Sequence, residues 1–192
     1  MSQENVEIGR GVQMALRTLS ESESQRRTID ERLFVRLPAL FRLLSERVIR
    51  LSPGSRIRRI MLTRLIRRAY AAMYRRDFDV LLPRLDPALE YRPRGGLFSV
   101  DVDTVIHGRE GYRNLWETTL EAFDDLWIEA HEVVDFGDRF VITFHLRAHG
   151  SASGVPVSQR VFELVEMRRG LVARAEDFQD RSEALEAAAR RE

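Results

Sequence analysis

The spacing of apolar residues changes inside one stretch of this chain, residues 105–116, and that change constrains the fold more than any other feature. Residues 99–106 carry apolar side chains at alternating positions, a period that is typical of a strand. Beyond them, Tyr112 and Trp116 belong to a set with helical spacing. A strand therefore ends and a helix begins here. The chain after residue 57 can be arranged around this junction as helices on a curved sheet that encloses a pocket.

Helices are expected on the N-terminal side of the junction. Apolar residues recur at helical spacing over residues 33–51 and again over 57–75, and a Ser-Pro-Gly-Ser turn separates the two segments. Pro38 either starts the first helix or kinks it. The apolar residues among 6–19 suit one short helix, which a Ser/Glu-rich linker follows.

Strands are expected on the C-terminal side. Phe140, Ile142, Phe144 and Leu146 alternate with more polar residues in the clearest period-two pattern of the chain. The other elements that the pattern predicts are a short helix at 77–87, a strand at 88–92, a helix at 109–123, strands at 126–135, 155–167 and 171–178, and a terminal helix at 181–191.

Composition excludes several kinds of chemistry. The chain has no cysteine, so a disulfide framework, a thiol nucleophile and a thiolate metal site are ruled out. Its formal net charge is +1, which argues against attraction of the whole protein to nucleic acid. The histidines have no carboxylate at metal-ligand spacing, so we expect no metal, and we expect no cofactor.

The start of the chain has neither a basic segment nor an apolar run, so we expect a cytoplasmic protein. Every basic side chain is an arginine, and many arginines lie in the helices expected at residues 33–76. A solvated helix face explains them best. Docking of these helices on an anionic membrane surface is the weaker alternative.

Several short motifs resemble the nuclear transport factor 2-like superfamily, and within it the SnoaL-like, polyketide-cyclase-like group. The strongest is His107-Gly108-Arg109-Glu110-Gly111 ahead of Trp116. The other resembling stretches are residues 68–72, 76–78, 85–91, 134–138 and 174–180. No single motif is specific, but their order and spacing cover about two-thirds of the chain.

The resemblance implies an α+β fold, a cone-shaped barrel in which a bent antiparallel sheet wraps round three helices and leaves a pocket at its open end. Residues 56–192 would form this SnoaL-like domain, and residues 1–55 an N-terminal helical extension that is the chief departure from the family. Proteins of this superfamily include isomerases, cyclases, epoxide hydrolases and dehydratases, and others only bind. The fold therefore underdetermines the function.

Comparison with ketosteroid isomerase argues against that reaction. Its catalytic base aligns with Tyr91, its tyrosine with Ala69 beside Tyr70, and its protonated acid with a position near Phe162. None of the three residue types is preserved, so this arrangement of base and enolate-binding groups is absent.

Other acid/base chemistry stays open. The carboxylates that could turn inward are Glu90, Asp101, Asp103, Glu163, Glu176 and Asp177. On the last strand, Val172, Arg174, Glu176 and Phe178 share a face that their apolar members mark as inward, so Glu176 is a candidate catalytic acid beside Arg174. A structural ion pair is the more ordinary reading of those two residues. His107, at the helix start, is the second catalytic candidate, as a general base; hydrogen bonding to the turn is the other reading of this histidine.

The residues expected to line the pocket are mostly aromatic: Tyr70, Met73, Tyr91, Trp116, Phe144 and Phe162, with Arg174 and Phe178 on the last strand. The leading hypothesis is a protein that binds a small, mostly apolar molecule there. The alternatives are an acid/base enzyme of the cyclase, isomerase or epoxide-hydrolase type, and a non-enzymatic module. In that module the convex strand face with Thr143, His145 and Arg147 would pair with a second copy as a homodimer.

Overall fold

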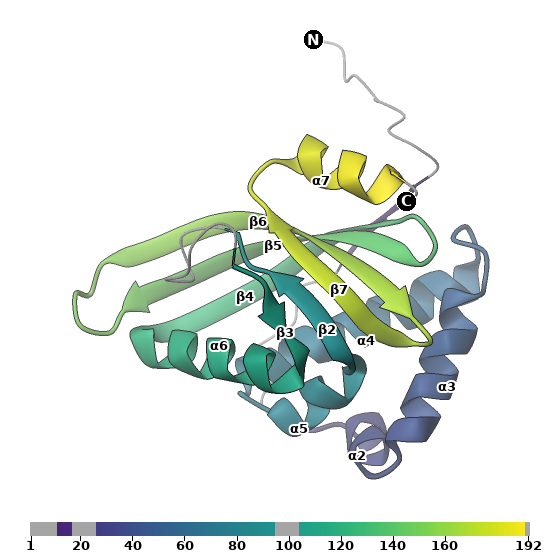
Figure 1. Cartoon of the computed structure of the whole chain (residues 1–192), viewed down its shortest axis with the longest axis horizontal. Helices are drawn as coiled ribbons and strands as arrows, with labels where there is room; N and C mark the ends of the chain where they lie inside the picture. The colour runs from purple at the N-terminus through teal and green to yellow at the C-terminus, as the bar shows by residue number, and fades with distance from the viewer. Residues whose placement is uncertain (1–10, 17–25, 95–103, 191–192) are drawn as a thin grey trace.

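The computed structural model describes residues 11–16, 26–94 and 104–190. Helices gather on one side of a bent sheet, and a single terminal helix lies on the other (Figure 1). In chain order the elements are β1 (Val12–Ala15), α2 (Ile29–Arg36), α3 (Pro38–Ile49), α4 (Arg56–Tyr74), α5 (Phe78–Leu81), the 3-10 helix η1 (Leu82–Arg84), β2 (Leu85–Arg92), β3 (Ile106–His107), α6 (Gly108–Ala122), β4 (Phe123–Asp135), β5 (Arg139–Gly150), β6 (Pro156–Arg168), β7 (Leu171–Phe178) and α7 (Arg181–Ala189).

The described strands form one sheet in the order β1-β4-β5-β6-β7-β2-β3. Neighbouring strands run antiparallel except for β2 and β7, which run parallel. The expected α+β cone is confirmed, with the difference that the sheet stays open between its edge strands β1 and β3. The strand expected at 99–106 is described only at its end, because residues 95–103 lie outside the described residues.

The helices follow the predicted pattern closely. The proline at position 38 is the first residue of α3, where its missing N–H costs nothing, so the long helix expected at 33–51 is two helices that meet at Leu37. The junction that changes period is the step from β3 to α6, with His107 as the N-cap residue of α6.

The prediction of a short helix near the N-terminus is wrong for the described residues 11–16. Val12–Ala15 is a strand that pairs with residues 132–135 of β4. Met14 turns into the core beside Leu62 and Val133, while its neighbours Gln13 and Ala15 are exposed. A four-residue segment cannot show whether its period is two or 3.6, so pairing with a strand edge decided its structure.

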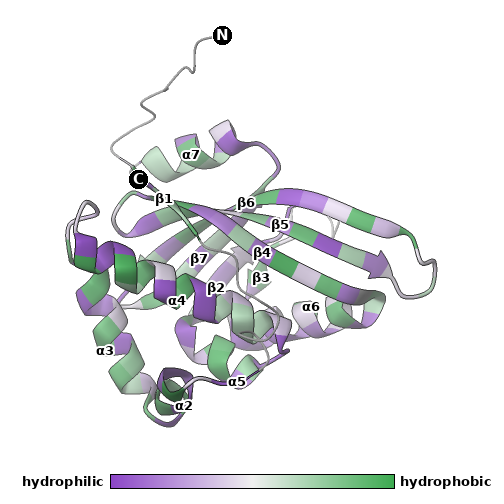
Figure 2. Ribbon diagram, turned by 180° about the vertical axis from the view of Figure 1, so that it is seen from behind, coloured by the Kyte–Doolittle hydropathy of each residue, from purple (hydrophilic) through white to green (hydrophobic). Residues whose placement is uncertain are grey.

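Both faces of the central strands are covered. Phe140, Ile142 and Phe144 face the helices, whereas Val141 lies under α7 with Phe162 and Phe178. Figure 2 shows the resulting bands of hydrophobic and hydrophilic residues along β4, β5 and β6. Of the convex-face residues expected to meet a second copy, Thr143 is buried, while the side chain of Arg147 is 57% exposed. Dimerisation stays a prediction.

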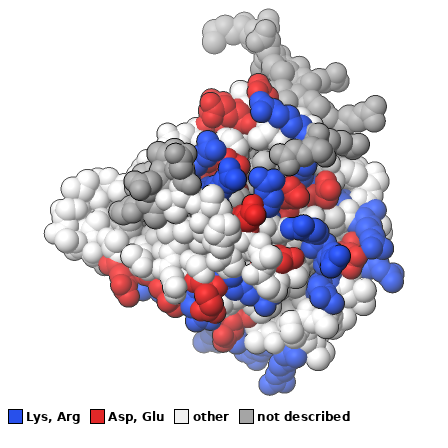
Figure 3. Space-filling view, viewed as in Figure 1, with Lys and Arg blue, Asp and Glu red and all other residues white. Residues whose placement is uncertain are grey.

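The surface carries charges of both signs. Figure 3 shows acidic and basic groups interspersed, with a pale, uncharged end where β5 and β6 meet. In the described part of the chain, no helix is both long and apolar enough to cross a bilayer.

Candidate functional site

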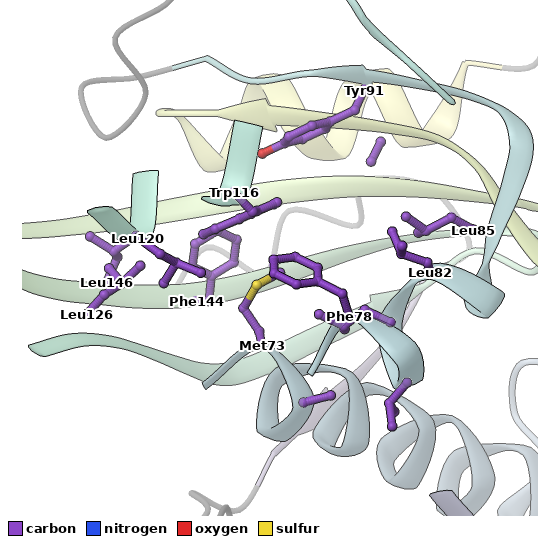
Figure 4. Packing of buried hydrophobic residues seen from close by; sticks show 14 of the residues in the cluster. Met73, Phe78, Leu82, Leu85, Tyr91, Trp116, Leu120, Leu126, Phe144 and Leu146 are labelled. Carbon is purple, nitrogen blue, oxygen red and sulfur yellow. The ribbon is translucent and has the colours of Figure 1, made fainter. Parts of the chain in front are cut away.

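A cavity of about 150 Å³ lies between the concave face of the sheet and helices α3, α4 and α6. Its wall is mainly aliphatic and aromatic, and an apolar cavity of about this size holds a ligand the size of benzene. Figure 4 shows how side chains of α4, α6 and the strands point towards this shared interior, with the hydroxyl oxygen of Tyr91 directed inward. A cavity of this volume has room for about one ring.

Two carboxylates face each other across neighbouring strands inside this cavity. Glu163 on β6 is the register partner of Asp177 on β7, so both side chains leave the sheet on the same face. Directly opposite residues in an antiparallel pair have Cβ atoms roughly 5 Å apart. The two acids therefore form a pair at the centre of the concave face.

Each carboxylate accepts one hydrogen bond from a tyrosine. The Tyr70 hydroxyl on α4 donates to Glu163 Oε2 at 3.1 Å, and the Tyr91 hydroxyl on β2 donates to Asp177 Oδ2 at 2.7 Å. The second oxygen of Asp177, Oδ1, is buried and has no hydrogen-bond partner among the described residues. Tyr112 stacks at an angle on Tyr91, with ring centroids 5.6 Å apart, and completes this wall.

Burial controls protonation at the pair. It raises the pKa of Glu163 to about 7, against the smaller opposing effect of the Tyr70 hydrogen bond. It also raises the pKa of Asp177 well above the ordinary range, and the charge of Glu163 raises it further. Ionising both carboxyl groups would place two negative charges close together, which costs free energy. The pair therefore retains a proton near neutral pH and titrates as a unit.

The tyrosines stay protonated. Burial, followed by the nearby carboxylates, raises the pKa of Tyr70 and Tyr91 well above 10. Both hydroxyls are therefore donors throughout the physiological range. Glu163 and Tyr70 also keep some accessible surface although protein encloses them, because their side chains border the cavity. A ligand in the cavity would touch both.

Five of the residues expected in the pocket do line it: Tyr70, Met73, Tyr91, Trp116 and Phe144. The other expected residues lie elsewhere. Phe162 and Phe178 pack under α7 on the convex side. Arg174 lies 3.9 Å from Glu90, with its side chain 38% exposed.

Neither expected catalytic residue reaches the cavity. Glu176 bonds Arg94 at 2.7 Å on the outer side of β7, and His107 is exposed at the start of α6. The cause on β7 is a bulge. Glu166 pairs with Arg174 but the next residue, Met167, pairs with Val172, so Ala173 is an extra residue that reverses the alternation. Val172 and Asp177 both line the cavity for this reason.

Glu163 and Asp177 are two of the six carboxylates that were expected to be able to turn inward, but the sequence pattern did not distinguish them from the other four. Asp101 and Asp103 of that set lie outside the described residues. A usable signal was present on β6: Val161, Glu163, Val165 and Met167 alternate with residues on the other face, so Glu163 is a lone charge on an apolar stripe. Within the described ranges, no three His, Asp or Glu side chains gather as a metal site would require.

Comparison with known proteins agrees with the α+β cone architecture. A model of the SnoaL-like domain matches residues 66–175. A putative polyketide cyclase from Streptomyces antibioticus is 20% identical, with 64% of this chain and 94% of that chain covered at a TM-score of 0.53. A putative hydroxylase from Streptomyces galilaeus is 20% identical, covering 63% and 90% at a TM-score of 0.51.

A nuclear transport factor 2-like protein from Burkholderia thailandensis is similar over 67% of this chain and 96% of that chain, with 19% identity and a TM-score of 0.54. At such identities the likeness concerns the fold. No curated protein matches the sequence.

Proposed function

The chain belongs to the SnoaL-like domain family, and from this premise we propose that it binds a small, mostly apolar molecule in the cone cavity and transfers a proton on it. The observation that carries the proposal is the pair Glu163 and Asp177, enclosed in an apolar cavity and hydrogen-bonded only by tyrosines among the described residues. A pair that holds one proton near neutral pH contains both a general acid and a general base.

The step follows from these protonation states. The ionised carboxylate takes a proton from a carbon beside a ligand carbonyl, and the electrons of that C–H bond form the enol double bond. The protonated carboxyl gives its proton to the carbonyl oxygen. If the ligand has a C=C bond conjugated with the enol, the newly protonated carboxyl gives its proton to the far carbon while the enol hydroxyl returns its proton to the other carboxylate, which completes an isomerisation. Alternatively the enol carbon attacks a second carbonyl and closes a ring: the oxygen of that carbonyl takes the proton of the protonated carboxyl, and the enol hydroxyl returns its proton to the other carboxylate. The surrounding apolar wall strengthens both hydrogen bonds by excluding water.

Exchange of hydrogen for deuterium tests this step without knowledge of the natural ligand. The probe is 4-phenyl-2-butanone, which has one ring and a ketone, and its loss of α-protons in D₂O is followed by NMR. We expect exchange above the buffer rate, and a loss of roughly 100-fold or more in Glu163→Gln and in Asp177→Asn.

The matched control is Glu166→Gln, the same change on the same strand but outside the cavity, where the side chain faces Arg139. It should exchange like the wild-type protein. A loss in Glu176→Gln instead would give the role to the residue expected from strand alternation. Binding of the ketone, seen as a shift in Tm, without any exchange would contradict the proton-transfer part of the proposal.

A further inference from the structure

The extension contributes a wall to the cavity. Phe41, Ser45 and Ile49 lie at spacings of four residues on α3, so they share one face of that helix, and all three line the cavity. The SnoaL-like domain model matches residues 66–175, so α3 adds this wall from outside the matched residues.

The helix is held firmly in that place. Arg58, which is fully buried, donates through Nη1 to the carbonyl oxygens of Val48, Ile49 and Leu51 at the C-terminal end of α3. On its other side the helix backbone touches the β6–β7 turn, where a Cβ atom at Gly170 would collide with the carbonyl oxygen of Arg42. The wall formed by α3 is therefore part of the folded core.

An arginine that has no counter-ion among the described residues borders this part of the cavity. Arg84 is 8% exposed, lines the cavity, and has its guanidinium 5.0 Å from the centroid of the Phe41 ring. Its Nε donates to the carbonyl oxygen of Val80 at 3.1 Å and its Nη1 to that of Leu65 at 2.9 Å. No carboxylate of the described residues lies within ion-pair distance of it.

The nearest compensating charges are already engaged. Glu31 and Asp30 on α2 raise the pKa of Arg84, but Glu31 bonds Arg75 at 2.9 Å and Asp30 lies 3.1 Å from Arg64. Burial is the larger effect and lowers the pKa of Arg84 to about 10. The guanidinium is still charged at neutral pH, and an uncompensated buried charge is costly to the fold.

A buried serine hydroxyl lies on the same wall. Ser45 is 1% exposed, and its Oγ makes no hydrogen bond to any described residue, including the carbonyl one turn earlier that helical serines often use. Ser45 follows Phe41 by one helical turn, and Phe41 packs against Arg84. A charged donor and a buried hydroxyl thus border the same end of the cavity.

This end is separate from the acid pair. On β6, Glu163 precedes Met167 by four residues, a rise of roughly 13 Å along an extended strand, and α3 meets the turn beyond Met167. Arg84 is also not among the groups that shift the pKa of Glu163 or Asp177. The cavity therefore has the acid pair at one end and Arg84 at the other, and mostly apolar side chains line it between them.

We propose that Arg84 and Ser45 form a subsite that binds a carboxylate group of the ligand. The inference rests on the proposed function, since it assumes that the cavity holds a ligand, and it narrows the ligand to a small carboxylic acid. A guanidinium matches the two oxygens of a carboxylate, and the Ser45 hydroxyl supplies one more donor. The carboxylate provides the counter-ion that the described chain does not.

The experiment compares 3-phenylpropanoate with 3-phenylpropanamide, which have nearly the same shape, by isothermal titration calorimetry at neutral pH. We expect the wild-type protein to bind the carboxylate roughly tenfold more tightly or better. Arg84→Met should abolish this preference, and Ser45→Ala should weaken carboxylate binding roughly threefold while leaving the amide unaffected.

Two control variants separate this subsite from general effects. Arg94→Met removes another cavity-lining arginine, but one whose charge Glu176 already neutralises, and it should keep the preference. Ser52→Ala makes the serine change at an exposed position and should bind both probes normally. If Arg84→Met does not fold, the affinity of Ser45→Ala for the carboxylate tests the subsite by itself. This variant should fold, because it removes one oxygen atom that has no partner in the described chain.

Equal affinity of the wild-type protein for the two probes would overturn the subsite and leave the cavity proposal standing. Exchange of 4-phenyl-2-butanone together with no binding of either new probe would do the same. If none of the three compounds binds, the proposed function fails and the subsite fails with it.

Discussion

Two pairs of buried charged residues, one between α4 and β4 and one between β6 and β7, differ in how their charges are satisfied. Arg58 and Asp135 are both fully buried and form a two-point contact, with Nε and Nη2 each 2.7 Å from a carboxylate oxygen. Glu163 and Asp177 face each other with only tyrosines as partners among the described residues. The first pair has a charge and its counter-charge, whereas the second has two groups of the same sign.

The difference indicates what each pair does. Arg58 uses its remaining donors on carbonyl oxygens at the end of α3 and at Gly137, so the first pair joins the extension to the sheet. Glu163 and Asp177 border a cavity, and burial raises the pKa of both. A buried charge that is fully paired with an opposite charge is typical of a structural contact. Buried charged groups that lack an opposite charge and border a cavity are typical of a ligand-binding site. Arg84 resembles the second pair, because it also borders the cavity and has no counter-ion among the described residues.

The largest expected effect comes from breaking the complete pair. Arg58→Met leaves the Asp135 carboxylate buried without its cation, and we expect a loss of about 3–5 kcal/mol in the free energy of unfolding, measured by urea denaturation. Arg56→Met, a similar change at an exposed position two residues earlier, should stay within about 0.5 kcal/mol of the wild-type protein. A loss below about 1 kcal/mol in Arg58→Met would mean that the pair is not scaffold.

The incomplete pair should make stability depend on pH. Burial raises the pKa of Glu163 from 4.5 to about 7, so between these values the folded protein holds a proton that the unfolded chain releases. The stabilisation is complete below about pH 4.5 and is lost as the pH rises through 7, a fall on the order of 3 kcal/mol. Asp177 acts in the same direction.

Urea denaturation at pH 5, 6, 7 and 8 measures this dependence. Glu163→Gln, which removes the titrating group but keeps its shape, should flatten the curve. Parallel curves for the wild-type protein and the variant would show that Glu163 does not titrate in this range.

A smaller effect tests the contact that holds α3 against the sheet. In Gly170→Ala the new Cβ would collide with the backbone of α3 at Arg42 and lie 2.8 Å from the amide nitrogen of Glu46. In Gly154→Ala the φ angle is also positive, at 63°, but no atom lies within 4 Å of the new Cβ. Both variants pay a backbone penalty of about 1 kcal/mol, and Gly170→Ala should lose about 1–2 kcal/mol more. Equal losses would indicate that α3 moves aside easily.

The local sequence pattern was enough to predict the structure wherever one interaction dominates. The alternation of Phe140, Ile142 and Phe144 predicted which face of β5 points inward, because burial of large apolar side chains leaves one choice of register. Pro38 predicted that a helix starts there or is kinked there, and the first alternative holds, because α3 begins at Pro38. The motif at residues 107–111 identified the fold family, although it lies outside the cavity.

Local pattern failed on β7, where both faces are covered. Phe178 is buried under α7 and Ala175 is buried against the cavity, so hydrophobicity does not mark one side as inward. The bulge at Ala173 then reverses the alternation, and the residue types around it do not predict a bulge. The expectation that placed Glu176 and Arg174 in the pocket fails for these two reasons, and Asp177 lies there instead.

Periodicity and side-chain type over many residues were enough to predict the order of the elements from residue 56 on, the family, and the apolar character of the cavity wall. Which charged groups are paired follows from the folded chain alone. Whether Arg58 meets Asp135, and whether Arg84 meets any carboxylate, depends on elements far apart in the chain coming within a few ångströms. The proposed chemistry of this protein rests on that pairing, so it becomes visible once the chain is folded.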